Sequence, residues 1–78
     1  MEISYTELEK YLQQGREVEF FYNEKKYSFN HSHVGWHLTE YYNISQDFKN
    51  VKDMLKYGRI EGKSIKKIWD DVEIDCLF

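Results

Sequence analysis

The stretch EVEFFY, residues 17–22, decides how this chain folds. Polar and apolar residues alternate along its first half, which is typical of a strand with one buried face. Successive side chains of a strand point to opposite faces of the sheet, so Val18, Phe20 and Tyr22 belong to the core face. Phe21 then points to the other face, where an aromatic ring needs a separate explanation.

The alternation continues beyond a polar turn. Asn23-Glu24 stands between two apolar stretches, which favours it as the centre of a tight hairpin turn. A polar connection over residues 30–35 separates the second strand from a third. The inner positions of these two later strands are Tyr27, Phe29, Trp36 and Leu38. The pattern predicts a three-stranded antiparallel meander.

Capping signals predict helices on both sides of the meander. Ser4-Tyr5-Thr6-Glu7 has the spacing of a capping box, which begins a helix over residues 5–14. Ser64 is expected to cap a short helical turn later in the chain, because its hydroxyl is a good acceptor for the first free amides of a helix.

A further helix is predicted between these two. Ser45 or Asp47 is expected to cap it, and the apolar positions Phe48 and Val51 follow at helical spacing. Gly58 is placed to end this helix.

The C-terminal segment has the clearest strand pattern. Val72, Ile74, Cys76 and Phe78 alternate with acidic residues, so one face is apolar and the other acidic. An apolar strand face needs a sheet to join. Residues 1–78 are therefore predicted to form one α+β domain, in the order helix, antiparallel three-stranded meander, two helices and a C-terminal strand that joins the sheet.

Composition limits the kinds of protein this chain is expected to be. Its 78 residues are enough for one core, and 41% hydrophobic with 32% charged residues is a globular balance. The sequence has no apolar run of the roughly 18 residues that a membrane span needs. It lacks the pattern of a secretory signal, and the lone Cys76 permits no internal disulfide. We therefore expect a cytoplasmic protein without membrane contact.

Two patterns resemble chemical sites, and each has a simpler structural interpretation. Gly62-Lys63-Ser64 is similar to the end of a phosphate-binding loop, but the spacing to the preceding Gly58 is wrong and a helix precedes it. His31, His33 and His37 would share one face of a continuous strand and offer metal ligands there, but a fourth ligand is missing. Turn and loop roles are the preferred interpretations.

The remaining reactive groups also favour structural roles. Cys76 is assigned to the apolar face of the last strand, where a thiol behaves as a small hydrophobe. The acidic residues of the strands are expected to serve solubility and to protect sheet edges. The sequence therefore predicts no enzyme, cofactor, bound metal or small-molecule substrate.

Aromatic residues make up 18% of the chain, more than a small core is expected to hold. Phe21, Tyr41 and Tyr42 are the rings left outside the predicted core. A helix that covers the second sheet face would account for them, as would tyrosine rings lying flat with their hydroxyls in water. A contact patch is the other interpretation, because aromatic residues concentrate binding energy at protein interfaces. It predicts a non-enzymatic interaction module that binds a protein partner or a second copy as a homodimer.

Charge is unevenly distributed along the chain, although the net charge is only -3. Residues 25–67 carry nine basic and four acidic residues, whereas the segments before and after are acidic. A nucleic-acid-binding protein is therefore the alternative hypothesis, weakened by the acidic total. The residues that would contact nucleic acid are Lys49, Lys52, Lys56, Lys63, Lys66 and Lys67.

Three segments carry a resemblance to known proteins: RIEGKSIKKIWDDVEI (59–74), GREVEF (15–20) and KYSF (26–29). Together they resemble small uncharacterised proteins of Gram-positive bacteria and their phages or mobile elements. The resemblance implies a bacterial cytosolic setting and a mobile-element origin. If the gene is carried by a phage, the expected partner of the interaction module is a host protein. It assigns no functional residue.

Overall fold

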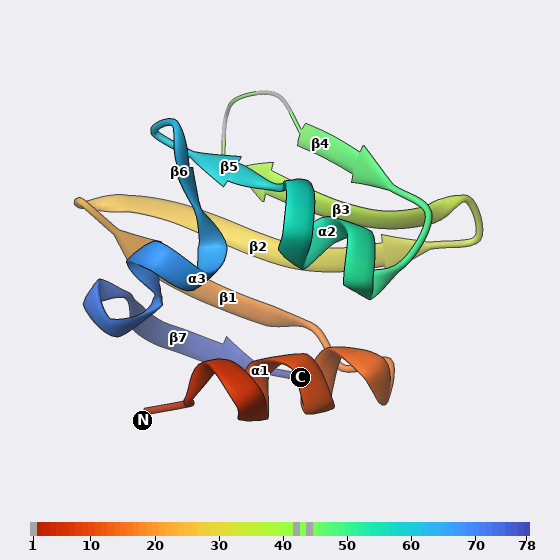
Figure 1. The fold of residues 1–78 in the computed structure, drawn as a ribbon, viewed down its shortest axis with the longest axis horizontal. Helices are drawn as coiled ribbons and strands as arrows, with labels where there is room; N and C mark the ends of the chain where they lie inside the picture. Colours follow the sequence, from red (N-terminus) through yellow and green to blue (C-terminus); the bar gives the residue numbers. More distant parts are fainter. Residues whose placement is uncertain (1, 42, 44) are drawn as a thin grey trace.

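The structure is a computed structural model that describes residues 2–41, 43 and 45–78. A five-stranded antiparallel sheet runs in the order β4-β3-β2-β1-β7, with three helices on one side (Figure 1). The strands of this sheet are β1 (Val18–Tyr22), β2 (Lys25–Ser32), β3 (Gly35–Glu40), β4 (Ser45–Phe48) and β7 (Glu73–Leu77). The predicted α+β class is confirmed, and the C-terminal strand joins the sheet beside β1.

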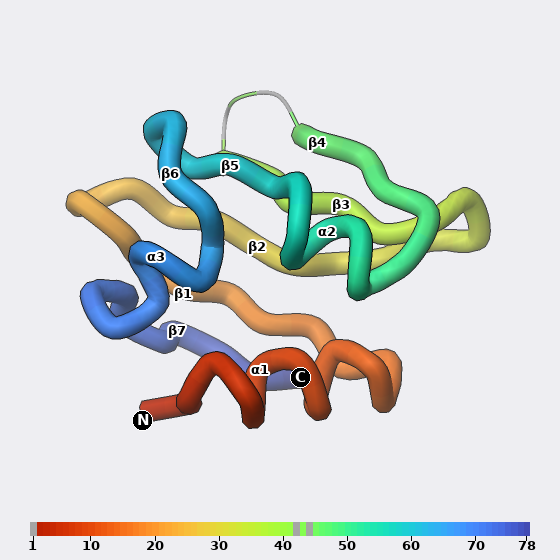
Figure 2. The backbone as a smooth tube through the Cα atoms, in the orientation of Figure 1, coloured from red at the N-terminus to blue at the C-terminus, as the bar shows by residue number. Residues whose placement is uncertain are grey.

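The other elements cover the sheet or connect its strands. They are α1 (Tyr5–Gln13), α2 (Val51–Tyr57), the two-stranded hairpin β5 (Arg59–Ile60) and β6 (Lys63–Ser64), α3 (Ile65–Ile68) and the 3-10 helix η1 (Trp69–Asp71). The tube in Figure 2 shows that the chain leaves β4, forms α2, the small hairpin and α3 above one face, and returns to the far edge as β7.

Helix α1 begins as the sequence predicts. The Ser4 hydroxyl accepts from the Glu7 amide at 3.1 Å, and the Glu7 carboxylate accepts from the Ser4 amide at 2.9 Å. Both bonds satisfy amides that a helix start leaves without partners. The same bonds lower the pKa of the Glu7 carboxyl from its ordinary value, because they favour the charged form.

The predicted hairpin is confirmed. Asn23 and Glu24 have φ of 52° and 65°, which is the left-handed backbone that a two-residue turn between twisted strands requires. The turn fixes the register of β1 against β2, in which Phe20 pairs with Tyr27 and Phe21 with Lys26. Phe21 therefore lies on the opposite sheet face from Phe20.

The predicted start of the second helix is wrong. Ser45 and Asp47 belong to strand β4, and Phe48 pairs with Trp36 of β3 at its end. The helix begins after Asn50, whose side chain accepts from the Asp53 amide at 2.8 Å. A four-residue segment next to an exposed strand edge gains more from ladder hydrogen bonds than from one further helical turn, and local spacing does not reveal this.

The last strand contains a β-bulge, which changes the predicted direction of its final side chains. Phe20 pairs with Ile74 and Glu19 with Cys76, so Asp75 is an extra residue in β7. The extra residue shifts the alternation by one position, which turns Cys76 to the outer face and brings Leu77 opposite Val18 on the inner one. The assignment of Cys76 and Phe78 to the apolar face is therefore wrong, and Phe78 is 60% exposed.

The core lies between the sheet and the helices, around the ring of Phe20. Phe20 is fully buried, and its ring centroid is 5.6 Å from that of Tyr27, 5.1 Å from Phe29 and 5.3 Å from Trp69. The helices contribute Leu8, Leu12, Val51, Met54, Leu55, Ile65 and Ile68 to the same cluster. All three helices therefore pack on one face.

In the described part of the chain, no helix has the length and apolar character needed to span a membrane.

Candidate functional site

The second face of the sheet is left uncovered by the described helices, which all pack on the core side. We call it the open face. Register and alternation assign to it Glu17, Glu19, Phe21, Lys26, Ser28, Asn30, Ser32, His37, Thr39, Tyr41, Asp47, Glu73, Asp75 and Cys76. The question that the sequence left open, whether a helix covers this face, is answered for the described residues.

The centre of the open face is organised by Lys26. Its ammonium is 3.2 Å from a carboxylate oxygen of Glu19 and 3.0 Å from one of Asp75. The same ammonium is 5.8 Å from the ring centroid of Phe21 and 4.9 Å from that of Tyr41, within cation–π range of both. The Tyr41 hydroxyl donates to Glu19 at 2.5 Å, so the five side chains form one connected cluster.

Hydrogen bonding keeps this cluster in a defined charge state. Bonds to Asp75 and then to Glu19 raise the pKa of the Lys26 ammonium above its ordinary value. The bond to Glu19, followed by burial, raises the pKa of the Tyr41 hydroxyl. Lys26 therefore stays a cation and Tyr41 a neutral donor, which is the combination that a cation–π contact and a hydroxyl–carboxylate bond require.

The structure brings together two of the three predicted contact residues. Phe21 and Tyr41 flank Lys26 and are both half-buried, whereas Tyr42 lies outside the described residues. Sequence reasoning missed Lys26 and its partner Asp75. The position of Lys26 could have been predicted from the hairpin turn, because a two-residue loop at Asn23-Glu24 places residue 26 directly opposite residue 21.

Glu19, Asp75 and Cys76 form the group of potential metal ligands in the described part of the chain, with ligand atoms within 4.8 Å of one another. The Lys26 ammonium already provides a cation to both carboxylates. The ion pairs with Lys26 therefore explain why these two carboxylates lie close together, and we do not assign a metal site to the group.

The open face is acidic. Among the residues of the described five-stranded sheet that point to this face, Lys26 is the one Lys or Arg. The acidic residues there are Glu17, Glu19, Asp47, Glu73 and Asp75. A shallow depression of about 420 Å³ lies beside Tyr41. It is lined by Glu17, Glu19, Ser28, Asn30, Thr39 and Tyr41.

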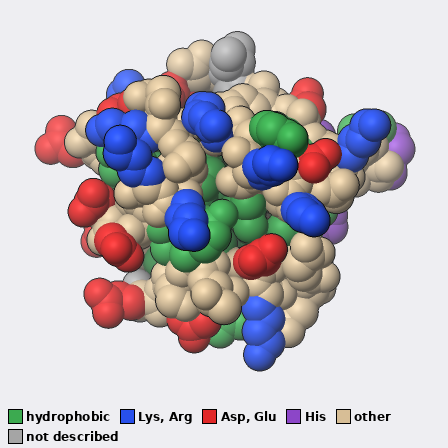
Figure 3. All heavy atoms as spheres, in the orientation of Figure 1, with side chains coloured by type: hydrophobic (Ala, Val, Ile, Leu, Met, Phe, Trp, Pro, Cys, Tyr) green, Lys and Arg blue, Asp and Glu red, His purple; other side chains and the backbone are tan. Residues whose placement is uncertain are grey.

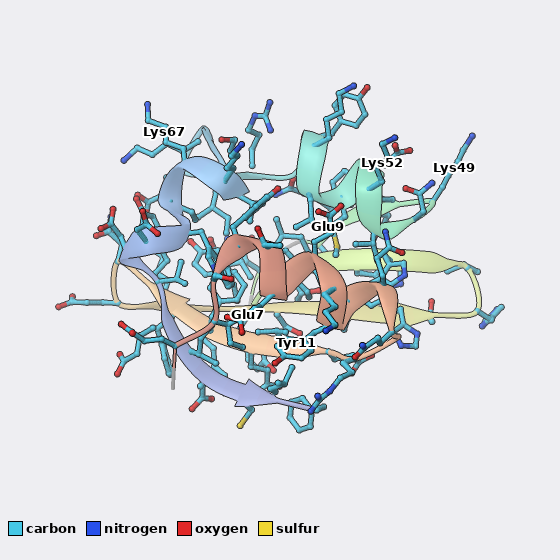
Figure 4. The ribbon with its side chains drawn as sticks, turned by 60° about the horizontal axis from the view of Figure 1, so that its bottom comes forward. Glu7, Glu9, Tyr11, Lys49, Lys52 and Lys67 are labelled. Atoms are coloured by element: carbon cyan, nitrogen blue, oxygen red, sulfur yellow. The ribbon has the colours of Figure 1, made fainter. Side chains whose placement is uncertain are left out.

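The opposite, helical side of the molecule carries charges of both signs and includes a group of exposed lysines. The six lysines singled out from the sequence are all exposed and lie on α2, β6, α3 and the loop before α2. Figure 3 shows blue side chains interspersed with red ones over this helical side, and Figure 4 shows Lys49, Lys52 and Lys67 pointing away from the sheet. No ion pair among the described residues includes any of the six.

The three histidines are separated by the structure. His31 pairs with Trp36, whereas His37 pairs with Asn30, so His31 and His37 lie on opposite faces, and His33 lies in the turn between the strands. The condition for a shared face, one continuous strand through all three positions, is therefore not met, and His31 and His37 belong to strands where a loop role was preferred. A turn at 33–34 ends β2 before the third histidine is reached.

His37 instead connects two polar neighbours on the open face. Its Nδ1 is 2.8 Å from Asp47 Oδ1, and its Nε2 is 2.9 Å from Ser32 Oγ. Sequence reasoning missed Ser32 and Asp47, because the three residues come from three strands whose pairing no local pattern fixes.

These features define a small α+β domain with an acidic, aromatic open sheet face and a helical side that carries six exposed lysines. The chain matches no protein-family model, no curated protein and no solved structure.

Proposed function

We propose that this chain is a non-enzymatic protein-interaction module of the bacterial cytosol, encoded by a phage or mobile element, whose open face binds a host protein. The observation that carries the proposal is the pair of rings, Phe21 and Tyr41, held on either side of Lys26 on a face without a covering helix. Aromatic side chains bring large contact area to an interface with little loss of conformational entropy.

Charge identifies the chemistry of the partner. The two carboxylates nearest the centre are neutralised in part by Lys26, but Glu17, Asp47 and Glu73 carry negative charge around them. A complementary surface is basic, and it would bury the rings while pairing with these outer carboxylates. A second copy of the chain is less suitable, because its own open face carries the same excess of carboxylates and would repel the first.

Serine substitutions at both rings test the proposal. We expect the double variant Phe21→Ser and Tyr41→Ser to lose more than about tenfold of its affinity for a basic partner captured from a Gram-positive lysate, because interface aromatics contribute about 1–2 kcal/mol or more each. Binding by the unmodified chain should weaken as salt rises, since the outer carboxylates act through solvent. Titration with the purified partner measures both effects.

The matched control is Tyr57→Ser, because Tyr57 is 56% exposed on the helical side. This variant should bind as tightly as the unmodified chain, and all variants should remain folded, with a cooperative thermal transition above the temperature of the binding assay. Equal affinity of the double variant and the unmodified chain would remove the open face as the docking surface. A concentration-dependent dimer that the double variant disrupts would assign the face to self-association instead.

The exposed lysines of the helical side favour a second candidate, the binding of single-stranded nucleic acid. Six exposed lysines without ion pairs among the described residues would pair with phosphates, and Tyr57 beside Lys56 offers a ring for stacking. If all six contact phosphates, the logarithm of affinity should fall against the logarithm of salt concentration with a slope of about −4. Oligonucleotide titration at several salt concentrations checks this, with Lys52→Glu and Lys56→Glu weakening binding and the open-face variant leaving it unchanged.

A further inference from the structure

Three side chains from three neighbouring strands form a continuous chain of hydrogen bonds on the open face. Ser32 at the end of β2 contacts His37 of β3 at 2.9 Å, and His37 contacts Asp47 of β4 at 2.8 Å. The order of the groups is hydroxyl, imidazole, carboxylate. The two imidazole nitrogens are both engaged, one on each side.

The carboxylate decides how the protons are arranged. A carboxylate oxygen only accepts hydrogen bonds, so the tautomer that completes this chain has the hydrogen on His37 Nδ1 and directs the lone pair of Nε2 to the Ser32 hydroxyl. The Ser45 hydroxyl donates to the same Asp47 Oδ1 at 3.2 Å and helps to hold that carboxylate in place. A serine hydroxyl in contact with an oriented imidazole is the arrangement that activates serine as a nucleophile.

The surroundings of Ser32 leave room for a small reagent. Ser32 is exposed, whereas the His37 side chain is only 18% exposed and is held between strands. A shallow depression of about 300 Å³ adjoins Ser32, with Trp36 and Lys49 in its lining. The Val34 amide donates toward Ser32 Oγ at 3.4 Å, so a backbone donor lies next to the hydroxyl.

We propose that Ser32 is an acylation site that accepts an acyl group from an activated donor such as an aryl ester or thioester. Ser32 Oγ forms a bond to the carbonyl carbon while its proton passes to His37 Nε2. The bond from that carbon to the leaving oxygen or sulfur then breaks, and the leaving group takes the proton from His37. The products are an ester at Ser32 and a free alcohol or thiol, with no change in oxidation state. This reactivity is independent of the proposed docking function.

The test uses p-nitrophenyl acetate with the full chain and measures the acetylation rate of each peptide by mass spectrometry. Ser45 is the internal control, because it is exposed and contacts the same Asp47 oxygen but has no imidazole partner. We expect Ser32 to be acetylated about a hundredfold faster than Ser45, the lower end of what a positioned general base contributes. Hydroxylamine should remove the acetyl group from Ser32 and leave acetyl-lysine intact.

Two variants test the role of the imidazole. His37→Gln should lower the Ser32 rate by about a hundredfold without changing the Ser45 rate, and Asp47→Asn should lower it by about tenfold, because the imidazole loses its orientation. Similar rates at Ser32 and Ser45 in the unmodified chain would overturn the proposal, as would a Ser32 rate that a folded His37→Gln variant retains. The ratio of the two serine rates decides the matter even where a variant fails to fold.

Discussion

Phe20→Ala is expected to lower the free energy of unfolding by about 3–5 kcal/mol, because the fully buried ring leaves a cavity that its neighbours fill only in part. The rings of Tyr27, Phe29 and Trp69 all lie against it, so aromatic contacts are lost together with the buried area. A small domain has a total stability on the order of 5–15 kcal/mol, so this variant loses a large part of it. Urea titration followed by tryptophan fluorescence measures the change.

The adjacent residue provides the matched control. Phe21 has the same side chain on the same strand but lies half-buried on the open face. Phe21→Ala should cost about 1 kcal/mol or less, because it removes a partly solvated contact with Lys26 and leaves no closed cavity. Equal losses at the two positions would mean that Phe21 is a core residue and that the open face is not exposed in solution.

Gly35→Ala is expected to cost more than about 3 kcal/mol, from backbone strain and a steric clash together. Gly35 has a φ of 142°, a conformation that side chains rarely adopt. A Cβ built there would lie 2.4 Å from the backbone oxygen of Phe48, so β3 and the end of β4 would have to separate. The loss of stability should appear in the same urea titration.

Gly15→Ala separates strain from the clash. Gly15 also has a positive φ, 86°, but no atom lies within 4 Å of the Cβ that alanine would add. We expect this variant to lose only about 1 kcal/mol, the usual cost of a left-handed backbone for a residue with a side chain. A loss at Gly35 no larger than at Gly15 would contradict the close contact between Gly35 and β4.

Local sequence patterns correctly predicted the elements that depend on interactions between residues close together in the sequence. The capping box fixed the start of α1, and the alternation EVEFFY fixed which rings of β1 enter the core. Strand β4 was mistaken for a helix start because Ser45 and Asp47 are good capping residues in isolation. Their environment includes the free edge of β3, which no sequence window contains.

The candidate site was predicted only in part, for the same reason. The outward direction of Phe21 follows from strand alternation, whereas its position beside Tyr41 depends on the pairing of β2 with β3. The central position of Lys26 depends on the pairing of β1 with β2 and β7, which brings Glu19 and Asp75 to its ammonium. Cys76 moved to the open face because β7 has a bulge where it pairs with β1.

The sequence by itself determined the helix start at Ser4, the hairpin at Asn23-Glu24 and the inner face of β1. Each of these features depends only on residues that are a few positions apart in the sequence. Only the tertiary structure decided which polar groups of distant segments meet, as with Ser32, His37 and Asp47 on three strands. Strand register is set by the burial of a whole sheet face. A bulge adds one residue to a strand, so every side chain after it points to the opposite face, although the alternation of residue types in the sequence is the same.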